Sequence, residues 1–259
     1  MRYLIPIVAL ATLAACNEPK GPTAAQRREA LDQQYRDQLA TEQRTLHVTD
    51  SLIAALLPAI NEVTAKQFEY EKTEYDDLGR YRPKGTDPGD NVQRTYLHSA
   101  VDEYGRTQLI ATYCGPKRFC VEQLSIKASD GTGVFTQVIK PNDGSNYQYD
   151  IDGVHYQSVT FAYAGRIAEA MTTDSAALAR ADTDNGALAF IAQNADDNGL
   201  KCWMVASDGK QQSLPISALD RQNMAATYEL GVMLRESIRL QQENKTAALK
   251  IEYLQTKTN

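Results

Sequence analysis

Residues 46–70 read LHVTDSLIAALLPAINEVTAKQFEY, and the apolar side chains in this stretch recur every three or four residues. Such spacing places them along one side of an α-helix, as a seam that packs lengthwise against another helix. The seam positions are Leu46, Thr49, Ile53, Leu56, Ile60, Val63, Gln67 and Tyr70, with Tyr35 and Leu39 extending the seam backwards. Helix-forming composition from Ala24 onwards predicts one long helix over residues 24–78. Pro58 interrupts the seam, which predicts a kink or a break near Leu57.

A second seam occupies residues 218–256, near the other end of the 259-residue chain. Its positions are Ala226, Leu230, Met233, Ser237, Leu240, Asn244, Ala247, Ile251 and Leu254. A polar residue such as Asn244 in a seam fixes the register of paired helices at some cost in stability. Two long amphipathic segments that bracket the chain favour an antiparallel coiled-coil pair, which would form a stalk. The alternative is that each helix packs separately on the body between them.

The residues between the loop that follows the first helix and the second seam, 92–217, have the pattern of a β-rich head. Asp-Gly dipeptides separate the apolar runs and supply the positive φ angles of tight hairpin turns. The predicted strands are 93–101, 106–113, 119–128, 133–139, 146–151, 154–163, 200–206 and 211–216. Most are consecutive, so we predict a largely antiparallel meander. The predicted fold class is therefore α+β, with a mainly antiparallel β-meander head flanked by long N- and C-terminal helices.

Two segments of the head have helical composition, residues 166–181 and residues 184–196. The second segment ends at Asn198-Gly199, a dipeptide typical of a helix C-cap. Its run of small and apolar residues over 187–191 is also compatible with a strand. The sequence predicts one or two short helices here and leaves the state of residues 184–196 open.

The charge of the chain argues against two kinds of partner. It carries 27 basic and 33 acidic residues, for a formal net charge of −6, and its Lys and Arg residues form no clusters. Such a chain lacks the basic patch of a nucleic-acid-binding protein and would gain little from electrostatic docking on anionic lipid. We therefore predict no nucleic-acid partner.

The N-terminus combines an apolar run, residues 4–11, with the sequence LAAC at residues 13–16. The run has the length of a signal-peptide core and is too short to span a bilayer. Residues 13–16 resemble the lipobox of bacterial lipoproteins. That resemblance implies that residues 1–15 are removed as a signal peptide, that Cys16 is lipidated, and that residues 16–23 form a tether. The alternative is an ordinary secretory signal with an incidental cysteine.

The resemblance to lipoproteins also implies a location in the bacterial cell envelope, with attachment to the membrane through acyl chains. Asn17 stands where an inner-membrane retention signal has Asp, which favours the outer membrane. The rest of the chain resembles uncharacterised envelope lipoproteins. The resemblance therefore assigns no activity and no functional residue beyond Cys16.

Three cysteines remain once Cys16 is assigned to lipid: Cys114, Cys120 and Cys202. Cys114 and Cys120 flank a turn-like insert, residues 115–118, which would place both at the neck of one hairpin. In an oxidising compartment this favours a Cys114–Cys120 disulfide and leaves Cys202 as a buried free thiol, although free thiols at all three positions are equally compatible with the spacing. The scattered cysteines and histidines lack the paired spacing of a zinc site.

Catalytic chemistry has no recognisable motif in this chain. A base working near neutral pH would be His98 or His155, which lie in predicted strands, whereas His47 lies among charged neighbours on the long helix. No nucleophile elbow accompanies these histidines. Phosphate-loop, H-E-x-x-H and paired C-x-x-C motifs are also absent. The sequence therefore predicts no catalytic residues, no cofactor and no metal ion.

Two acidic clusters, residues 194–199 and 182–186, partly match a calcium-binding loop. In the first, position twelve of the loop is Val205, where an EF-hand has a bidentate carboxylate. In the second, the glycine comes one position early. Both clusters are better explained as turns and helix caps.

Tyrosines stand at positions 147, 149, 156 and 163 of two predicted hairpin strands, and we expect them to share one face of the sheet. If exposed, Tyr147, Tyr149, Tyr156 and Tyr163 would form an aromatic platform for a glycan or a protein partner. If buried, they would be core beneath the helices. We expect burial, because the predicted helices need a surface to pack on.

These patterns together predict a membrane-anchored envelope lipoprotein with a binding or scaffolding role and no enzymatic activity. One alternative is an envelope hydrolase or glycan-processing enzyme that uses His98 or His155 with nearby carboxylates. A second alternative is a small-ligand or calcium-binding module. The sequence suggests an envelope protein or a glycan as partner, and it leaves the oligomeric state open.

Overall fold

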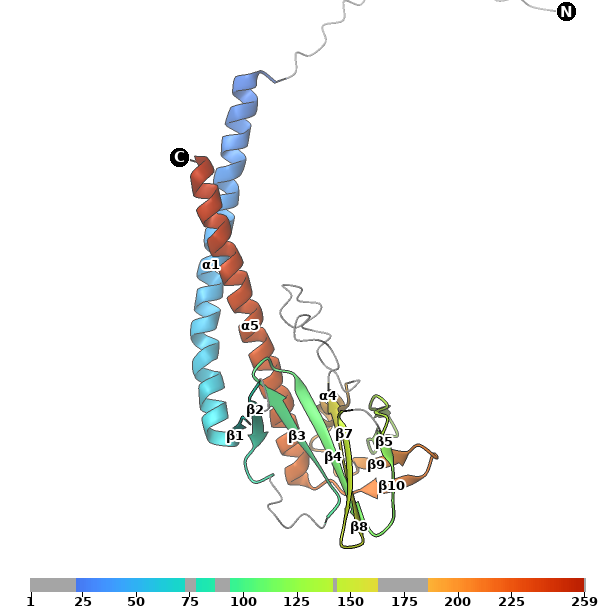
Figure 1. Cartoon of the computed structure of the whole chain (residues 1–259). Coiled ribbons are helices and arrows are strands. Elements are labelled where there is room, and N and C mark those ends of the chain that lie inside the picture. The colour runs from blue at the N-terminus through green and yellow to red at the C-terminus, as the bar shows by residue number, and fades with distance from the viewer. Residues whose placement is uncertain (1–21, 73–77, 87–93, 142–143, 163–185, 259) are drawn as a thin grey trace, which may run out of the picture.

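Two long helices form a stalk that extends from a β-rich head (Figure 1). The computed structural model describes residues 22–72, 78–86, 94–141, 144–162 and 186–258. The stalk consists of α1, Ala24–Gln67, and α5, Ala218–Thr258. The head is made of strands β1–β10 and the short helix α4, Ala187–Gln193. The α+β class predicted from the sequence is confirmed.

The two stalk helices pair antiparallel, as their seams predict. Lys250 of α5 forms an ion pair with Glu42 of α1, with Nζ 2.9 Å from Oε1. Nearer the head, Asn244 Nδ2 donates to Thr49 Oγ1 (3.0 Å) and to Asp50 Oδ1 (2.7 Å). The N-terminal end of α1 and the C-terminal end of α5 therefore lie together, at the end of the stalk farthest from the head (Figure 1).

Helix α1 begins at a capping box and continues through Pro58. Thr23 Oγ1 accepts the backbone N–H of Gln26, and Gln26 Oε1 accepts the backbone N–H of Thr23. Of the kink or break predicted near Leu57, the break is wrong, because α1 is one helix through this point; a kink there stays a prediction. Proline removes a hydrogen bond to the carbonyl four residues earlier. That residue, Ala54, is exposed, so water can satisfy its carbonyl.

The first helix ends at Gln67, and the prediction that it extends to residue 78 is wrong. Phe68 already has extended backbone angles (φ −122°, ψ 154°) and starts β1, Phe68–Glu71. Strand β1 pairs antiparallel with β2, Arg80–Pro83. Tyr70 fits the helical seam, but Phe68 and Tyr70 also fit the alternation of a strand. The strand is formed because it buries Phe68 in a cluster with Ile60 of α1.

The head contains two antiparallel sheets, with strand orders β1-β2-β3-β4-β8-β7 and β10-β9-β5-β6. The strands not yet bounded are β3 Tyr96–Asp102, β4 Thr107–Gly115, β5 Val121–Lys127, β6 Gly133–Phe135, β7 Asn146–Ile151, β8 Val154–Ala162, β9 Lys201–Ala206 and β10 Gln211–Leu214. All eight strands predicted from the sequence are present. They form two sheets and not one meander, because β5 and β6 follow β4 in the chain but belong to the second sheet, and β8 then pairs with β4 in the first.

The main core lies between the two sheets and beneath α4 and α5. Leu109 and Phe161 of the six-stranded sheet belong to the same buried cluster as Leu124 of the second sheet, Leu188 of α4 and Met224 of α5. The face of the six-stranded sheet that carries Leu109 and Phe161 is called the inner face below. Helix α4 shows that residues 187–193 of the segment left open in the sequence are helical, and the helix ends at Gln193, before the predicted C-cap at Asn198-Gly199. Residues 166–181 lie outside the described residues.

A buried polar network joins the two sheets. Gln157 of β8 has no exposed surface, and its side chain reaches the first residue of β5. Gln157 Oε1 accepts the Val121 N–H (2.7 Å), while Nε2 donates to Val121 O (2.9 Å) and to Asn146 Oδ1 (2.8 Å). Val121 N–H also bonds Phe119 O, and Asn146 Nδ2 also reaches Val121 O (3.3 Å). Each polar group of this network is therefore hydrogen-bonded.

Helix α5 lies directly on the turn between β3 and β4. A Cβ atom at Gly231 would lie 2.8 Å from Thr107 Cγ2 and 3.1 Å from Gly105 O. Arg235 Nη1 donates to Gly105 O (2.6 Å), and Ser99 Oγ of β3 donates to Thr227 Oγ1 (2.8 Å). Glycine at position 231 therefore allows the helix to approach the sheet closely enough for these bonds.

Candidate functional site

The two histidines considered as catalytic bases lie apart. His98 of β3 is paired through the sheet with Ile110 of β4, whereas His155 of β8 is paired with Gly115, five residues further along β4. His155 shares the inner face with Gln157, and His98 lies on the opposite, outer face. The His98 ring stacks on Tyr96 with centroids 5.3 Å apart. The structure therefore does not bring the two imidazoles into one cleft.

His155 is held in place by a carboxylate. It is 3% exposed, and its Nδ1–H donates to Asp150 Oδ1 (2.7 Å). Arg118 Nη2 lies 3.1 Å from Asp150 Oδ2. The hydrogen bonds from His155 and then from Arg118 lower the pKa of the Asp150 carboxyl below its usual range. His155 Nε2 is buried without a hydrogen-bond partner among the described residues, beside the Tyr113 ring. It faces core and lines neither of the stalk cavities reported below.

The cysteines of the head are free thiols in this structure. The hairpin that would bring Cys114 and Cys120 together does not form, because β4 and β5 belong to different sheets. The structural argument for a Cys114–Cys120 disulfide is therefore wrong. Cys202 is 1% exposed, and burial raises the pKa of its thiol well above the usual value, as expected of a buried free cysteine.

The first calcium-like cluster, residues 194–199, is a turn fixed by protein groups. Asp197 accepts the backbone N–H groups of Ser129 (2.7 Å) and Gly199 (2.8 Å). These bonds lower the pKa of the Asp197 carboxyl. Asn198 Oδ1 accepts a bond from the guanidinium of Arg221 (2.9 Å), so a cation of the protein already occupies this position. Among the described residues, no three His, Cys, Asp or Glu side chains are grouped as metal ligands. Residues 182–185 of the second cluster lie outside the described residues.

Tyrosines cover the outer face of β7 and β8. Tyr147 is 64% exposed and Tyr149 is 51% exposed, so the expectation that they are buried is wrong. Tyr149 stacks on Tyr156, with ring centroids 5.1 Å apart and planes 10° from parallel. Ile151 extends this surface and is 53% exposed. We call Tyr147, Tyr149, Ile151 and Tyr156 the tyrosine surface; Tyr163 lies outside the described residues.

Strand β7 reverses the usual rule that apolar residues point inwards. Its inward positions are polar: Asn146 is buried and hydrogen-bonded, and Asp150 contacts His155. Its outward positions carry Tyr147 and Tyr149. The helices α4 and α5 pack on the inner face of the sheet, so no helix of the described chain covers the tyrosines (Figure 1). Alternation in the sequence shows that Tyr147 and Tyr149 share a face, but it does not reveal which face the helices cover.

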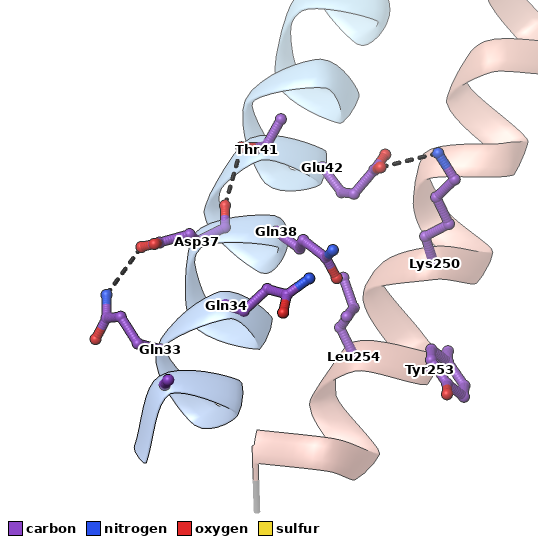
Figure 2. A pocket seen from close by; sticks show the side chains of 10 residues that line it. Gln33, Gln34, Asp37, Gln38, Thr41, Glu42, Lys250, Tyr253 and Leu254 are labelled. Atoms are coloured by element: carbon purple, nitrogen blue, oxygen red, sulfur yellow. Dashed lines mark hydrogen bonds and ion pairs between the residues drawn. The ribbon is translucent and has the colours of Figure 1, made fainter. Parts of the chain in front are cut away.

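Two cavities lie between the helices of the stalk. The one farther from the head has a volume of about 830 Å³ and is lined by residues 30–42 of α1 and 250–254 of α5. Figure 2 shows Gln34 and Gln38 directed from α1 towards Leu254 of α5, with the ion pair of Glu42 and Lys250 beside them. The second cavity, of about 330 Å³, is lined by residues 41–52 and 239–243. The three- and four-residue spacing of apolar residues predicts the buried contacts between paired helices, but it does not predict cavities beside those contacts.

Helix α1 is also the one described helix that is long and apolar enough to cross a membrane by length and composition. Only 11% of its most apolar stretch is buried in this structure. The stalk therefore exposes apolar side chains along α1.

No protein family model, curated protein or solved structure matches this chain.

Proposed function

We propose that this chain is a lipid-anchored protein of the bacterial cell envelope, with a non-enzymatic binding role, whose stalk holds a β-rich head away from the membrane. The anchor is the lipidated Cys16, and the membrane is the outer membrane. The head binds an envelope protein or a glycan through the tyrosine surface.

The inverted pattern of β7 is the observation that carries the binding role. Exposing Tyr147 and Tyr149 while burying Asn146 opposes the usual partition of side chains, and such local exceptions occur where a surface has a function. Tyrosine combines a large apolar ring with a polar hydroxyl, which suits it to contact surfaces. The stacked rings of Tyr149 and Tyr156 present a flat face on which a sugar ring or an apolar side chain can lie.

The stalk geometry supports the anchoring role. The N-terminal end of α1 lies at the end of the stalk farthest from the head (Figure 1). Residues 16–23 would span at most about 28 Å between a lipidated Cys16 and this helix end. The 44 residues of α1 then extend the chain by about 66 Å towards the head. A lipid at Cys16 would therefore hold the tyrosine surface several tens of ångströms above the bilayer.

The anchor is tested with Cys16→Ala in the full-length chain, with Cys114→Ser as the matched control. We expect the Cys114→Ser chain to incorporate labelled fatty acid and to sediment with membranes, as the wild type does. The Cys16→Ala chain should incorporate no label and should not be retained by acyl chains. A Cys16→Ala chain that still carries label, or a wild-type chain that never does, would refute the anchor.

The binding role is tested with a photo-crosslinking residue at Tyr147 in intact cells, compared with the same residue at Phe135. Both positions are exposed aromatics of the head, but Phe135 (51% exposed) lies in the second sheet. We expect specific adducts at position 147 only. In parallel, Tyr147→Ser with Tyr149→Ser should weaken sedimentation with insoluble cell-wall glycan if the partner is a glycan. Equal adducts at both positions, together with unchanged sedimentation, would refute the tyrosine surface as a binding site.

A further inference from the structure

Strand β7 forms an edge of the six-stranded sheet, and one side of its backbone is open. It is the last strand in the order β1-β2-β3-β4-β8-β7, so among the described residues it has a neighbouring strand on one side only. Thr160 of β8 donates its backbone N–H to Ser145 O (2.8 Å), at the position just before β7. Hydrogen-bonded and non-bonded residue pairs alternate along an antiparallel ladder. Tyr147 and Tyr149 therefore share backbone bonds with β8, as Ser145 does, and the residues between and after them do not.

Gln148 and Asp150 direct their backbone N–H and C=O groups away from β8, towards the open edge. Neither residue makes a backbone hydrogen bond to another segment of the described chain. The two residues are two positions apart, so these groups recur about every 6.8 Å along the edge. A further β-strand presents its own donors and acceptors at the same repeat. The backbone of the edge therefore matches an extended polypeptide.

The β7 edge lacks the features that commonly protect sheet edges. Short strands, Lys, Pro and bulges are frequent means of preventing further pairing. The other edge strands of the two described sheets, β1, β10 and β6, have four, four and three residues, whereas β7 has six. Strand β7 contains no Lys, Pro or Gly, and its register with β8 is regular. Its one charged side chain, Asp150, is held on the inner face by His155 and Arg118, so it does not project across the edge.

The tyrosine surface forms an apolar wall beside this edge. Tyr149 and Tyr156 are directly opposite each other in the register of β7 and β8. Their ring centroids are 5.1 Å apart, which is close to the spacing of neighbouring strands, so the two rings stack across the strands. One face of the Tyr149 ring lies against Tyr156, and the other face is therefore turned to the open edge. Tyr147 and Ile151 continue this wall, because they lie two positions before and after Tyr149 on the same face.

From these observations we propose that β7 binds an extended segment of another envelope protein, which adds to the six-stranded sheet as a seventh strand. Backbone hydrogen bonds to Gln148 and Asp150 hold the segment. Apolar side chains at every second position of the segment pack against Tyr147, Tyr149 and Ile151. The inference rests on the proposed function, and it narrows the partner of the tyrosine surface from a protein or a glycan to a protein strand.

A second copy of this chain does not fit the edge, an argument that rests on the proposed anchor at Cys16. Two identical edges pair about a two-fold axis, which makes the two β7 strands antiparallel. Strands β7 and β8 run roughly along the direction of the stalk (Figure 1), so the second stalk would extend in the opposite direction. Its anchor would then point away from the membrane of the first copy. The added strand therefore comes from a different protein.

The first test maps photo-crosslinks from the full-length chain in intact cells. A photo-crosslinking residue replaces Tyr147, Tyr149 or Ile151 in turn, and Phe135 of the second sheet is the control position. We expect all three positions of β7 to join one protein other than this chain. Mass spectrometry should place successive attachment points two residues apart in one segment of that protein. Attachment points scattered over its sequence, or adducts with a second copy of this chain, would overturn the inference.

The second test compares Gln148→Pro with Gln148→Ala and addresses the backbone bonds. Proline removes the outward N–H of residue 148, leaves the bonds to β8 intact and is tolerated on an edge strand, whereas alanine keeps the N–H. With the photo-crosslinking residue at position 147, we expect the adduct yield to fall about tenfold for Gln148→Pro and to stay unchanged for Gln148→Ala. Circular dichroism and urea unfolding check that both variants fold. Equal yields for the two folded variants would overturn the inference, and the crosslink map decides the matter where the proline variant does not fold.

The outcomes separate this inference from the proposed function. Specific adducts at position 147 that map to scattered points contradict strand addition alone. Weaker sedimentation of the tyrosine variants with cell-wall glycan, without protein adducts, also contradicts strand addition and leaves the tyrosine surface as a glycan site. Absence of specific adducts together with unchanged sedimentation contradicts the tyrosine surface itself.

Discussion

Replacing Gln157 with leucine should destabilise the head more than any other single loss of a polar side chain described above. The substitution removes three hydrogen bonds from a site with no solvent exposure. Val121 N–H keeps only its bond to Phe119 O, and Val121 O keeps the longer bond from Asn146. Asn146 Oδ1 is left without a partner among the described residues.

The expected magnitude follows from these losses. A buried acceptor left unsatisfied costs about 1–3 kcal/mol, and each further net hydrogen bond contributes about 0.5–1.5 kcal/mol. Burial of the apolar leucine side chain offsets part of this lost stability, so we expect the free energy of unfolding to fall by about 2–4 kcal/mol. Typical domains have only about 5–15 kcal/mol in total. Gln157→Glu should be worse near neutral pH, because a carboxylate would face the acceptors Val121 O and Asn146 Oδ1.

The assay is urea unfolding followed by the fluorescence of Trp203, the single tryptophan of the chain, which lies in β9. Gln148→Leu is the matched control, since Gln148 is the half-buried neighbour opposite Gln157 in the register of β7 and β8. We expect the control to change stability by no more than about 0.5 kcal/mol. Equal losses for both leucine variants, or a Gln157→Leu loss below about 0.5 kcal/mol, would refute the reasoning.

Three further predictions concern the head and the part of α5 that packs on it. The pKa of the Asp197 carboxyl is lowered in the folded state, so the stability that this carboxylate contributes is present above its unfolded pKa of about 4 and is lost as the pH falls through the lower folded pKa. Asp197→Asn should therefore reduce the fall in the urea midpoint of unfolding between about pH 5 and pH 3. An unchanged fall in the midpoint would contradict this. Gly231→Ala should lower the free energy of unfolding by about 1–3 kcal/mol, because the new Cβ would lie 2.8 Å from Thr107 Cγ2. Gly144→Ala is the control, since nothing lies within 4 Å of its Cβ position, and thermal unfolding compares the two variants. Cys202 should react with Ellman's reagent only after unfolding, because it is buried and its thiol pKa is raised, and rapid reaction of this residue in the native protein would argue against the described core.

The features that sequence predicts well here are those set by local periodicity. The three- and four-residue spacing around Leu46–Ile60 and around Leu230–Leu240 gives both stalk helices and their mutual contact, including the position of Asn244. Asp-Gly turns place the hairpins, since Gly153 and Gly209 both have φ of +78°. These signals depend on a few neighbouring residues, so no knowledge of the three-dimensional arrangement is needed.

The features that sequence misses depend on contacts between distant segments. Tyr70 satisfies the spacing of the helical seam and also the alternation of a strand with Phe68, and the burial of Phe68 beside Leu230 decides between the two. The exposure of Tyr147 depends on which sheet face α4 and α5 cover. For the candidate site, alternation identified the tyrosines as one group but predicted the wrong environment. The inward-facing Gln157 carries no signal in the sequence at all, because its partner Val121 lies 36 residues away.

The hydrogen bond between Thr49 and Asn244 joins residues 195 positions apart, and this separation has a consequence for biosynthesis. Helix α1 is synthesised before the head, whereas its partner α5 is synthesised after it. During the whole synthesis of the head, the apolar seam of α1 has no partner of its own chain. Contacts between such distant segments also form slowly, since they close the longest loops. We therefore expect α1 to need shielding by a chaperone until α5 has been synthesised, so that truncation within α5 would leave a folded head on an aggregation-prone helix.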